Sequence, residues 1–364
     1  MTTLERLSTA VEVVLGVDTH LDFHVAVALD QLGRRLGTLS VPTTTTGYRA
    51  LVCWARGFGS LRSAGIEGTG SYGAGLARHL KAKDIEVLEV ERPKRRHLRR
   101  SGKSDPIDAE AAARAVLSGE AAGKPKSGDG QAEMIRAFRA ARCSAVKSRI
   151  QATNQLRSLV VTAPDELRNR LRELSTTVLV TEALRLRPGD RPSSPVEATK
   201  FALRSIARRY KTLSKEIAEL DSQLDRLVAK VAPDLLAVPA VGTNHAATLL
   251  AVAGDNPERL RSEASFASLC GVAPIPASSG KTVRYRLNRG GDRDANRALH
   301  LICVVRMREL RTKEYVARRT AEGKTKREIM RCLKRYIARE VYRVLVPIVS
   351  PSPSGSMKET TSPT

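Results

Sequence analysis

Four acidic residues in the first third of the chain have the types and positions needed to bind metal ions together. Asp18 ends one apolar segment, and Glu67 ends another beside the glycines of a tight turn. Asp105 and Asp108 stand three residues apart at the start of an Ala-rich segment, so a helix there places both on one face. Carboxylate oxygens suit Mg²⁺, and two such ions roughly 4 Å apart activate a nucleophile at a phosphodiester. The four acids together therefore predict a two-magnesium site.

Each acid also has a simpler interpretation. Taken alone, Asp18 and Glu67 are typical turn residues at strand ends. Asp105 is typical of an N-cap followed by a proline at N1, and Asp108 then stands near the positive end of the helix dipole. Capping does not exclude metal binding, so this segment alone favours neither interpretation.

The histidines and cysteines have no spacing typical of a zinc site. The five cysteines are scattered and include no CxxC pair, which indicates reduced thiols packed as small apolar residues. His20, Asp22 and His24 alternate after Asp18. His20 could orient a substrate or a ligand, but the pattern favours exposed turn and strand residues.

The charge of the chain predicts a polyanionic partner. The chain has 364 residues, and 62 Lys and Arg against 38 Asp and Glu give a formal net charge of +24. No apolar run reaches the ~18 residues needed to span a bilayer, and no secretory signal is recognisable. Nucleic acid is thus the expected partner. Aromatic residues make up only 4%, which favours phosphate contacts over base stacking.

Two basic segments are the expected contacts with nucleic acid. They contain Arg95, Arg96, Arg99, Arg100 and Lys103 in the first, and Lys281, Arg284, Arg286, Arg289, Arg293 and Arg297 in the second. The second follows Ser278 and Ser279, either of which could be a nucleophile whose attack the arginines stabilise. No base stands close in sequence, so an activating group must come from elsewhere in the fold. The simpler alternative is a flexible loop and a basic helix that contact the DNA backbone.

The predicted elements form an α/β domain followed by helices. Three strands form a meander at residues 11–18, 23–30 and 34–42. Helices at 48–56, 75–83 and 105–119 then alternate with strands at 62–68 and 85–90. A linker and a long helical region follow. Apolar residues from Leu203 to Val231 then recur at heptad spacing, which predicts a coiled coil within the chain or, as we favour, with another subunit.

The C-terminal part is expected to be mainly helical. Residues 235–255 are similar to a helix-hairpin-helix, whose turn amides bind a DNA phosphate, although an ordinary helix pair fits equally well. We expect an α/β catalytic domain at 1–122, a helical coiled-coil and oligomerisation region at 123–232, a C-terminal domain at 233–348 and a disordered tail at 349–364.

Five segments in this order resemble the DEDD-type insertion-sequence transposases, which are related to Piv-type DNA invertases. They are GVDTHLDFHVAVALD, GIEGTGSYG, KSDPIDAEAAARAVL, LCGVAPIPASSGKT and RLNRGGDRDANRALH, between about residues 11 and 345. The resemblance implies a RuvC-like domain of RNase H fold, with Asp18, Glu67, Asp105 and Asp108 holding two Mg²⁺ ions. It also implies a C-terminal transposase domain whose serine nucleophile falls on Ser279, with Ser278 as the alternative.

The resemblance implies a site-specific recombinase that acts in the bacterial cytoplasm, at the nucleoid. It would form a covalent phosphoserine link with DNA, both donor and target, and then rejoin strands. The resemblance further implies a homo-oligomer, a dimer or tetramer in which one subunit's acidic site meets another's serine domain, and a structured guide RNA encoded by the element. Two other functions remain open from the residues: a Mg²⁺-dependent, Holliday-junction-type nuclease that uses water, and a non-catalytic nucleic-acid-binding scaffold. An inactive copy of an element is a third.

Overall fold

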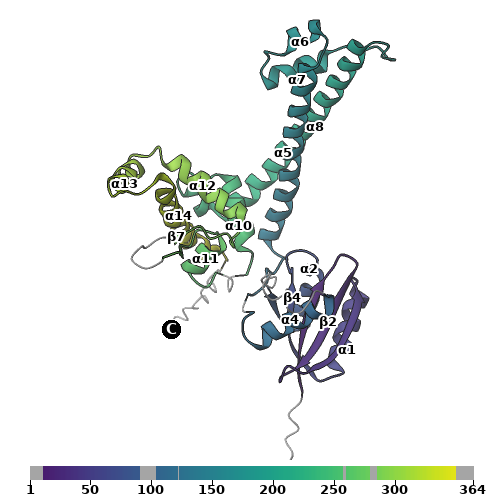
Figure 1. Cartoon of the computed structure of the whole chain (residues 1–364), viewed down its shortest axis with the longest axis vertical. Helices are drawn as coiled ribbons and strands as arrows, with labels where there is room; N and C mark the ends of the chain where they lie inside the picture. Colours follow the sequence, from purple (N-terminus) through teal and green to yellow (C-terminus); the bar gives the residue numbers. More distant parts are fainter. Residues whose placement is uncertain (1–10, 91–103, 122, 257–259, 279–284, 350–364) are drawn as a thin grey trace, which may run out of the picture. The chain divides into compact units, whose positions relative to one another are not determined.

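The structure is a computed structural model that describes residues 11–90, 104–121, 123–256, 260–278 and 285–349. The chain divides into two compact units (Figure 1). The first comprises the described residues up to Gly130 together with those of Ala253–Ser262, and the second comprises Gln131–Val252 and the C-terminal helices. The basic run from Arg95 to Lys103 and the tail from residue 350 lie outside the described residues.

A five-stranded mixed sheet forms the centre of the first unit, with strand order β3-β2-β1-β4-β5. The meander of β1, β2 and β3 is antiparallel, whereas β4 and β5 run parallel to β1. The strands span Glu12–Thr19, Phe23–Asp30, Arg35–Pro42, Ser60–Glu67 and Glu86–Val90. The predicted meander and the alternation that follows it are thus confirmed.

Helices cover both faces of this sheet (Figure 1). On one face α1 (Thr45–Arg56) and α2 (Ala74–Lys81) enclose the larger core, which includes Leu15, Leu51 and Ile66. On the other face α4 (Asp105–Leu117) packs Ala109 and Ala113 against apolar side chains of β1 and β2. This layered α/β arrangement is consistent with the predicted RNase H-like fold.

Two glycines let α4 lie unusually close to the sheet. Gly16 of β1 and Gly65 of β4 are partners in the parallel register, and both lie beneath α4. A Cβ on Gly16 would lie 1.9 Å from the carbonyl oxygen of Ala109, and one on Gly65 would lie 2.7 Å from that of Ala112. Since no side chain fits there, these two glycines determine how closely α4 packs against the sheet. That distance in turn determines the position of Asp105 at the start of α4.

Gly16→Ala is expected to destabilise the first unit and to displace α4. Overpacking typically costs about 1–3 kcal/mol, and contact with helix backbone places this substitution at the upper end or above. Thermal unfolding measures the loss. Gly70→Ala is the matched control, because a Cβ at Gly70 would meet no atom within 4 Å. Equal melting temperatures for the two variants would contradict the close approach.

In the second unit, α5 (Gln131–Val161) and α8 (Pro195–Val231) form a long helical hairpin (Figure 1). Arg142 pairs with Asp221, and Arg209 bonds Gln155, so the two helices are antiparallel. The end of the hairpin carries α6 (Asp165–Leu171) and α7 (Thr176–Arg185). The apolar seam of α8 is buried or half-buried within this chain. The seam therefore packs within this chain, and pairing with another subunit stays a prediction.

The remaining helices form a C-terminal helical body. They are α9 (Pro233–Ala237), α10 (Thr243–Ala253), α11 (Glu263–Leu269), α12 (Arg293–Arg306), α13 (Leu310–Ala321) and α14 (Lys326–Val349), with a small hairpin of β6 (Ile275–Pro276) and β7 (Tyr285–Arg286). The helix pair α9–α10 has the predicted glycine turn, and its phosphate contact stays a prediction. No helix among the described residues is long and apolar enough to cross a membrane.

Candidate active site

The carboxyl ends of β1 and β4 place two of the predicted acids side by side. Asp18 is the penultimate residue of β1, and Glu67 is the last residue of β4. The Thr19 hydroxyl donates a hydrogen bond of 2.9 Å to the carbonyl oxygen of Glu67, which ties the two strand ends together. Both acids therefore stand on a rigid sheet edge, as a metal site requires.

The start of α4 differs from the predicted cap by one residue. Ser104, not Asp105, is the N-cap, with an extended backbone at φ −152° and ψ 151°. Its carbonyl oxygen accepts from the backbone amides of Ile107 and Asp108. Asp105 is the first helical residue and Pro106 the second, which Pro tolerates because its missing amide has no helical partner. The Asp105 side chain is therefore not committed to capping and faces the sheet edge instead.

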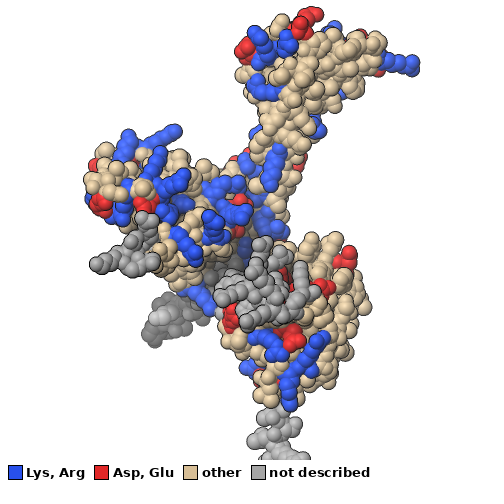
Figure 2. Space-filling view, viewed as in Figure 1, with Lys and Arg blue, Asp and Glu red and all other residues tan. Residues whose placement is uncertain are grey.

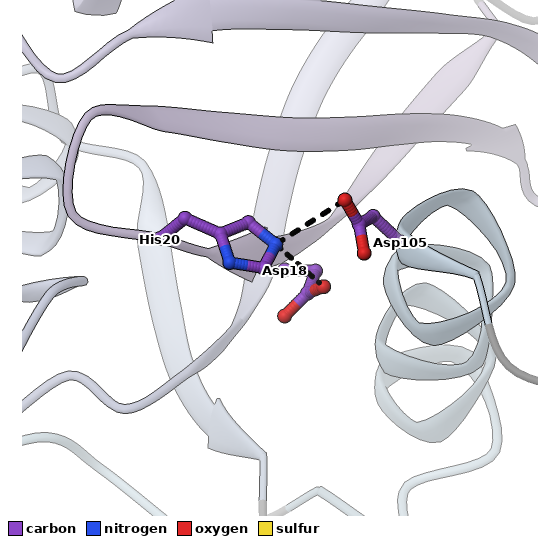
Figure 3. Close-up of side chains that lie close together, drawn as sticks. All are labelled: Asp18, His20 and Asp105. Atoms are coloured by element: carbon purple, nitrogen blue, oxygen red, sulfur yellow. Dashed lines mark ion pairs between the residues drawn. The ribbon is translucent and has the colours of Figure 1, made fainter.

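Asp18, His20 and Asp105 converge at this edge (Figure 3). The Nε2 atom of His20 lies 3.3 Å from an oxygen of Asp18 and 3.4 Å from an oxygen of Asp105. The three donor atoms lie within 4.8 Å of one another and could hold a metal ion. Gly16 and Gly65 make this meeting possible by admitting α4.

Glu67 and Asp108 lie outside this three-residue group but act on it electrostatically. Burial raises the pKa of the Asp18 carboxyl above its ordinary value. His20 lowers that pKa, whereas the negative charges of Glu67, Asp105 and Asp108 raise it. The other three predicted acids are therefore close enough to Asp18 to repel its ionised form, and a divalent cation would relieve that repulsion.

Asp18→Asn is expected to stabilise the protein when no divalent metal is present. Because folding raises the pKa of Asp18, its ionised form is less favourable in the folded than in the unfolded chain at neutral pH. Asparagine removes that cost, so the melting temperature of the metal-free variant should lie above that of the wild-type chain. Added Mg²⁺ or Mn²⁺ should then stabilise the wild-type chain but not the variant. A lower melting temperature for the metal-free variant would contradict the electrostatic argument.

Two histidines differ from the expectation that they are exposed. His20 follows β1 directly and is partly covered at the acidic site. His24 is fully buried in β2, and its ring stacks on Tyr48 with centroids 5.8 Å apart. Burial lowers the pKa of His24, which therefore belongs to the core as a neutral residue. The expected alternation of Asp18, His20 and His24 on one strand is wrong, because β1 ends at Thr19 and the chain turns before β2 begins at Phe23.

The predicted serine nucleophile lies in a segment flanked by β6 and β7. Ser278 is exposed and comes two residues after β6. Ser279, Lys281 and Arg284 lie outside the described residues, and β7 then pairs Tyr285 with Pro276. The pairing of β6 with β7 therefore holds the two ends of this segment together.

A polar network fastens the loop after α11 to the start of α12. The Asn296 side chain donates to the carbonyl oxygens of Cys270 and Gly271 at 3.1 and 2.9 Å. Lys334 of α14 is buried and donates to the Asn296 side-chain oxygen at 2.8 Å. Gly291 passes so close to Gly271 that a Cβ on Gly291 would lie 2.2 Å from a backbone nitrogen. Two of the predicted motifs thus form one structural unit, a connection that sequence spacing alone did not reveal.

Lys and Arg side chains gather over the C-terminal helices (Figure 2). Among the predicted contacts with nucleic acid, four are described and all are exposed, namely Arg286, Arg289, Arg293 and Arg297. Arg297 also pairs with Asp294 one turn earlier on α12. A surface of this composition suits phosphate contacts.

Comparison with known proteins finds two transposase family models that match different parts of the chain. A model of DEDD-type IS110 transposases, described as "Transposase", matches residues 15–163, and one described as "Transposase IS116/IS110/IS902 family" matches residues 232–317. Together the two matches span more than half of the chain. The first contains all four acids, and the second contains both serines and the arginines of the second basic segment.

Two curated proteins are also similar. The transposase for insertion sequence element IS1328 from Yersinia enterocolitica is 27% identical over 254 residues, or 68% of this chain and 71% of that protein. An uncharacterized 43.6 kDa protein of insertion element IS110 from Streptomyces coelicolor is 31% identical over 125 residues, or 33% of this chain and 31% of that protein. The first family model covers the acidic site, and the second follows it along the chain. This chain therefore belongs to the IS110 family of DEDD-type insertion-sequence transposases.

Proposed function

We propose that the chain cuts and rejoins the DNA of an insertion sequence through an acidic metal site and a serine nucleophile. Asp18, Glu67, Asp105 and Asp108 would hold the metal, as two Mg²⁺ ions, and Ser279 would attack the DNA. The convergence of Asp18 and Asp105 on one edge of the sheet is the observation that carries the proposal. Under a purely structural role, nothing would require acids from two distant segments to meet at the cost of mutual repulsion.

The donor atoms at this edge fit a divalent cation. Carboxylate oxygens are the ligands that hard divalent ions prefer, and the repulsion acting on Asp18 would be neutralised by a bound ion. When bound, such ions polarise the phosphate and stabilise the attacking and leaving oxygens. The acids fix those ions on a rigid scaffold, and the exposed arginines of the second unit hold the phosphate backbone.

The serine step conserves the energy of the phosphodiester bond. The Oγ atom of Ser279 would form a new bond to phosphorus, and its proton would pass to a base. The bond from phosphorus to a sugar oxygen would break, and that oxygen would take up a proton and leave as a hydroxyl. Attack by the hydroxyl of another strand on the phosphoserine would reverse this exchange and release the serine. No external energy source is needed, because one phosphodiester replaces another at each step.

A structured RNA and an oligomer are parts of the same proposal. A net charge of +24 is large enough to attract a second polyanion beside the DNA. Pairing of one subunit's acidic site with the serine segment of another would supply the base that Ser279 lacks nearby in sequence. Size measurement of the purified chain with and without RNA transcribed from the element's non-coding ends tests both parts.

The test of the proposed function is to look for protein-linked DNA. The purified chain is incubated with DNA carrying the ends of its element, the RNA and Mg²⁺, and the products are separated under denaturing conditions. DNA that migrates with the protein supports the serine reaction. Cut DNA without protein would instead identify a nuclease that uses water. Bound but uncut DNA under all metal conditions would favour a non-catalytic scaffold.

A further inference from the structure

His20 occupies a position in the acidic site that none of the four acids explains. It follows β1 directly, and its backbone amide donates to the carbonyl oxygen of Phe23 at 3.1 Å, which closes the turn into β2. The two aromatic rings lie 4.9 Å apart, so Phe23 supports the imidazole from one side. The turn and this packing hold the ring with Nε2 directed at the carboxylates (Figure 3).

The Nε2 atom of His20 is buried, yet it forms no hydrogen bond of acceptable geometry with any described residue. Oxygens of Asp18 and Asp105 lie only 3.3 and 3.4 Å away, so the shortfall is one of direction rather than distance. The three donor atoms thus lie in ion-pair contact without a well-directed hydrogen bond from Nε2, which fits ligands directed at a common point. A buried nitrogen without a hydrogen bond would otherwise lower stability.

The two separations from the His20 Nε2 atom match those between neighbouring ligands on a single ion. Bonds of about 2.1 Å to a metal place neighbouring donors roughly 3.0–3.5 Å apart in octahedral and tetrahedral sites. Both measured separations from Nε2 fall within this range. A neutral imidazole with its proton on Nδ1 presents a lone pair at Nε2, as in other metal-binding histidines.

We propose that His20 is a nitrogen ligand to one divalent ion of the acidic site, the one held by Asp18 and Asp105, so that a transition-metal ion such as Mn²⁺ can take the place of Mg²⁺ there. This inference rests on the proposed function, since it assumes that the acidic site binds metal. Imidazole nitrogen is a softer ligand than carboxylate oxygen, and its presence favours first-row transition metals over Mg²⁺. The chemistry of the step is unchanged, and a residue outside the four acids adds a nitrogen ligand that a transition-metal ion can use.

The experiment uses Mn²⁺ bound to the full chain, because this ion is paramagnetic and reports nitrogen ligands directly. Electron spin-echo spectra of the wild-type complex are expected to show coupling to a histidine nitrogen. His20→Gln keeps an amide donor at similar reach but removes the imidazole, so the coupling should disappear. The Kd for Mn²⁺ should rise about 10–100-fold, and the Kd for Mg²⁺ should change much less.

Three further variants make the outcome decisive. His300→Gln is the matched control, because this histidine is exposed on α12 and lies outside the acidic site; it should keep the coupling and the affinity. His20→Asn repeats the test should His20→Gln fail to fold. Coupling that persists in both His20 variants, or that is absent from the wild-type chain, overturns the inference.

Asp105→Asn separates this inference from the proposed function. If it weakens Mn²⁺ binding while His20→Gln does not, the histidine ligand is refuted and the acidic metal site stands. If neither substitution affects Mn²⁺ binding, or no Mn²⁺ binds, the acidic site fails and the inference fails with it.

Discussion

A Ser279→Ala variant is expected to form no covalent adduct with DNA, because the methyl side chain of alanine has no nucleophilic oxygen to attack phosphorus. Strand exchange should fall to background for the same reason, while affinity for DNA should remain, since the basic surface of the C-terminal helices is unaltered. The measurement compares adduct and DNA binding in parallel, the first on denaturing gels and the second by fluorescence anisotropy. The adduct should be lost completely, because Ser279 is the proposed nucleophile.

Ser278→Ala is the matched control for this prediction. Ser278 immediately precedes Ser279, so the two substitutions disturb the segment between β6 and β7 to a similar extent. We expect Ser278→Ala to retain the adduct. If instead the adduct survives in Ser279→Ala and disappears in Ser278→Ala, the nucleophile is Ser278. An adduct that survives in both variants refutes the serine mechanism.

Asp105→Asn is expected to lower recombination by about a thousandfold or more while DNA binding is retained. Loss of a carboxylate ligand removes several kcal/mol of the stabilisation that a bound metal gives the transition state, and each 1.36 kcal/mol changes the rate tenfold. Stability should change little, because Ser104 and not Asp105 is the N-cap of α4. Rates of strand cleavage at saturating DNA, together with melting temperatures, separate the two effects.

Asp165→Asn is the control for this second prediction. Asp165 is also the first residue of a helix, α6, but its side chain is 81% exposed and pairs with Arg168. The two substitutions share the helix position and the lost charge, so only the location of Asp105 beside Asp18 distinguishes them. Equal activities would mean that Asp105 serves only the helix start, as the scaffold interpretation requires.

The order of the elements was predictable from the sequence. Alternation in β1 to β3, the apolar segments ending at Asp18 and Glu67, and the Ala-rich helix that stops before Gly119 are local patterns, and local patterns reflect backbone preferences and burial. The family was also predictable, because its motifs stand in a definite order along the chain. The basic composition also predicted a nucleic-acid partner, because the net charge of a chain can be counted without knowledge of its fold.

Other features required knowledge of which segments meet. The heptad seam of α8 fits a partner helix equally well inside or outside the chain, and only the structure shows α5 covering it. Asn296 and Lys334 are ordinary polar residues in sequence, and their role in joining two motifs depends on packing between α12, α14 and the loop at Gly271.

The candidate site shows most clearly what sequence and tertiary structure each decided. Residue types and spacing determined that Asp18, Glu67, Asp105 and Asp108 were suitable for a metal and that strand ends and a helix start would carry them. The meeting of Asp18 with Asp105, and the entry of His20 between them, was decided by tertiary structure. The physical reason is steric: Gly16 and Gly65 lack the side chains that would hold α4 away from the sheet, and their effect appears only once helix and sheet are packed together.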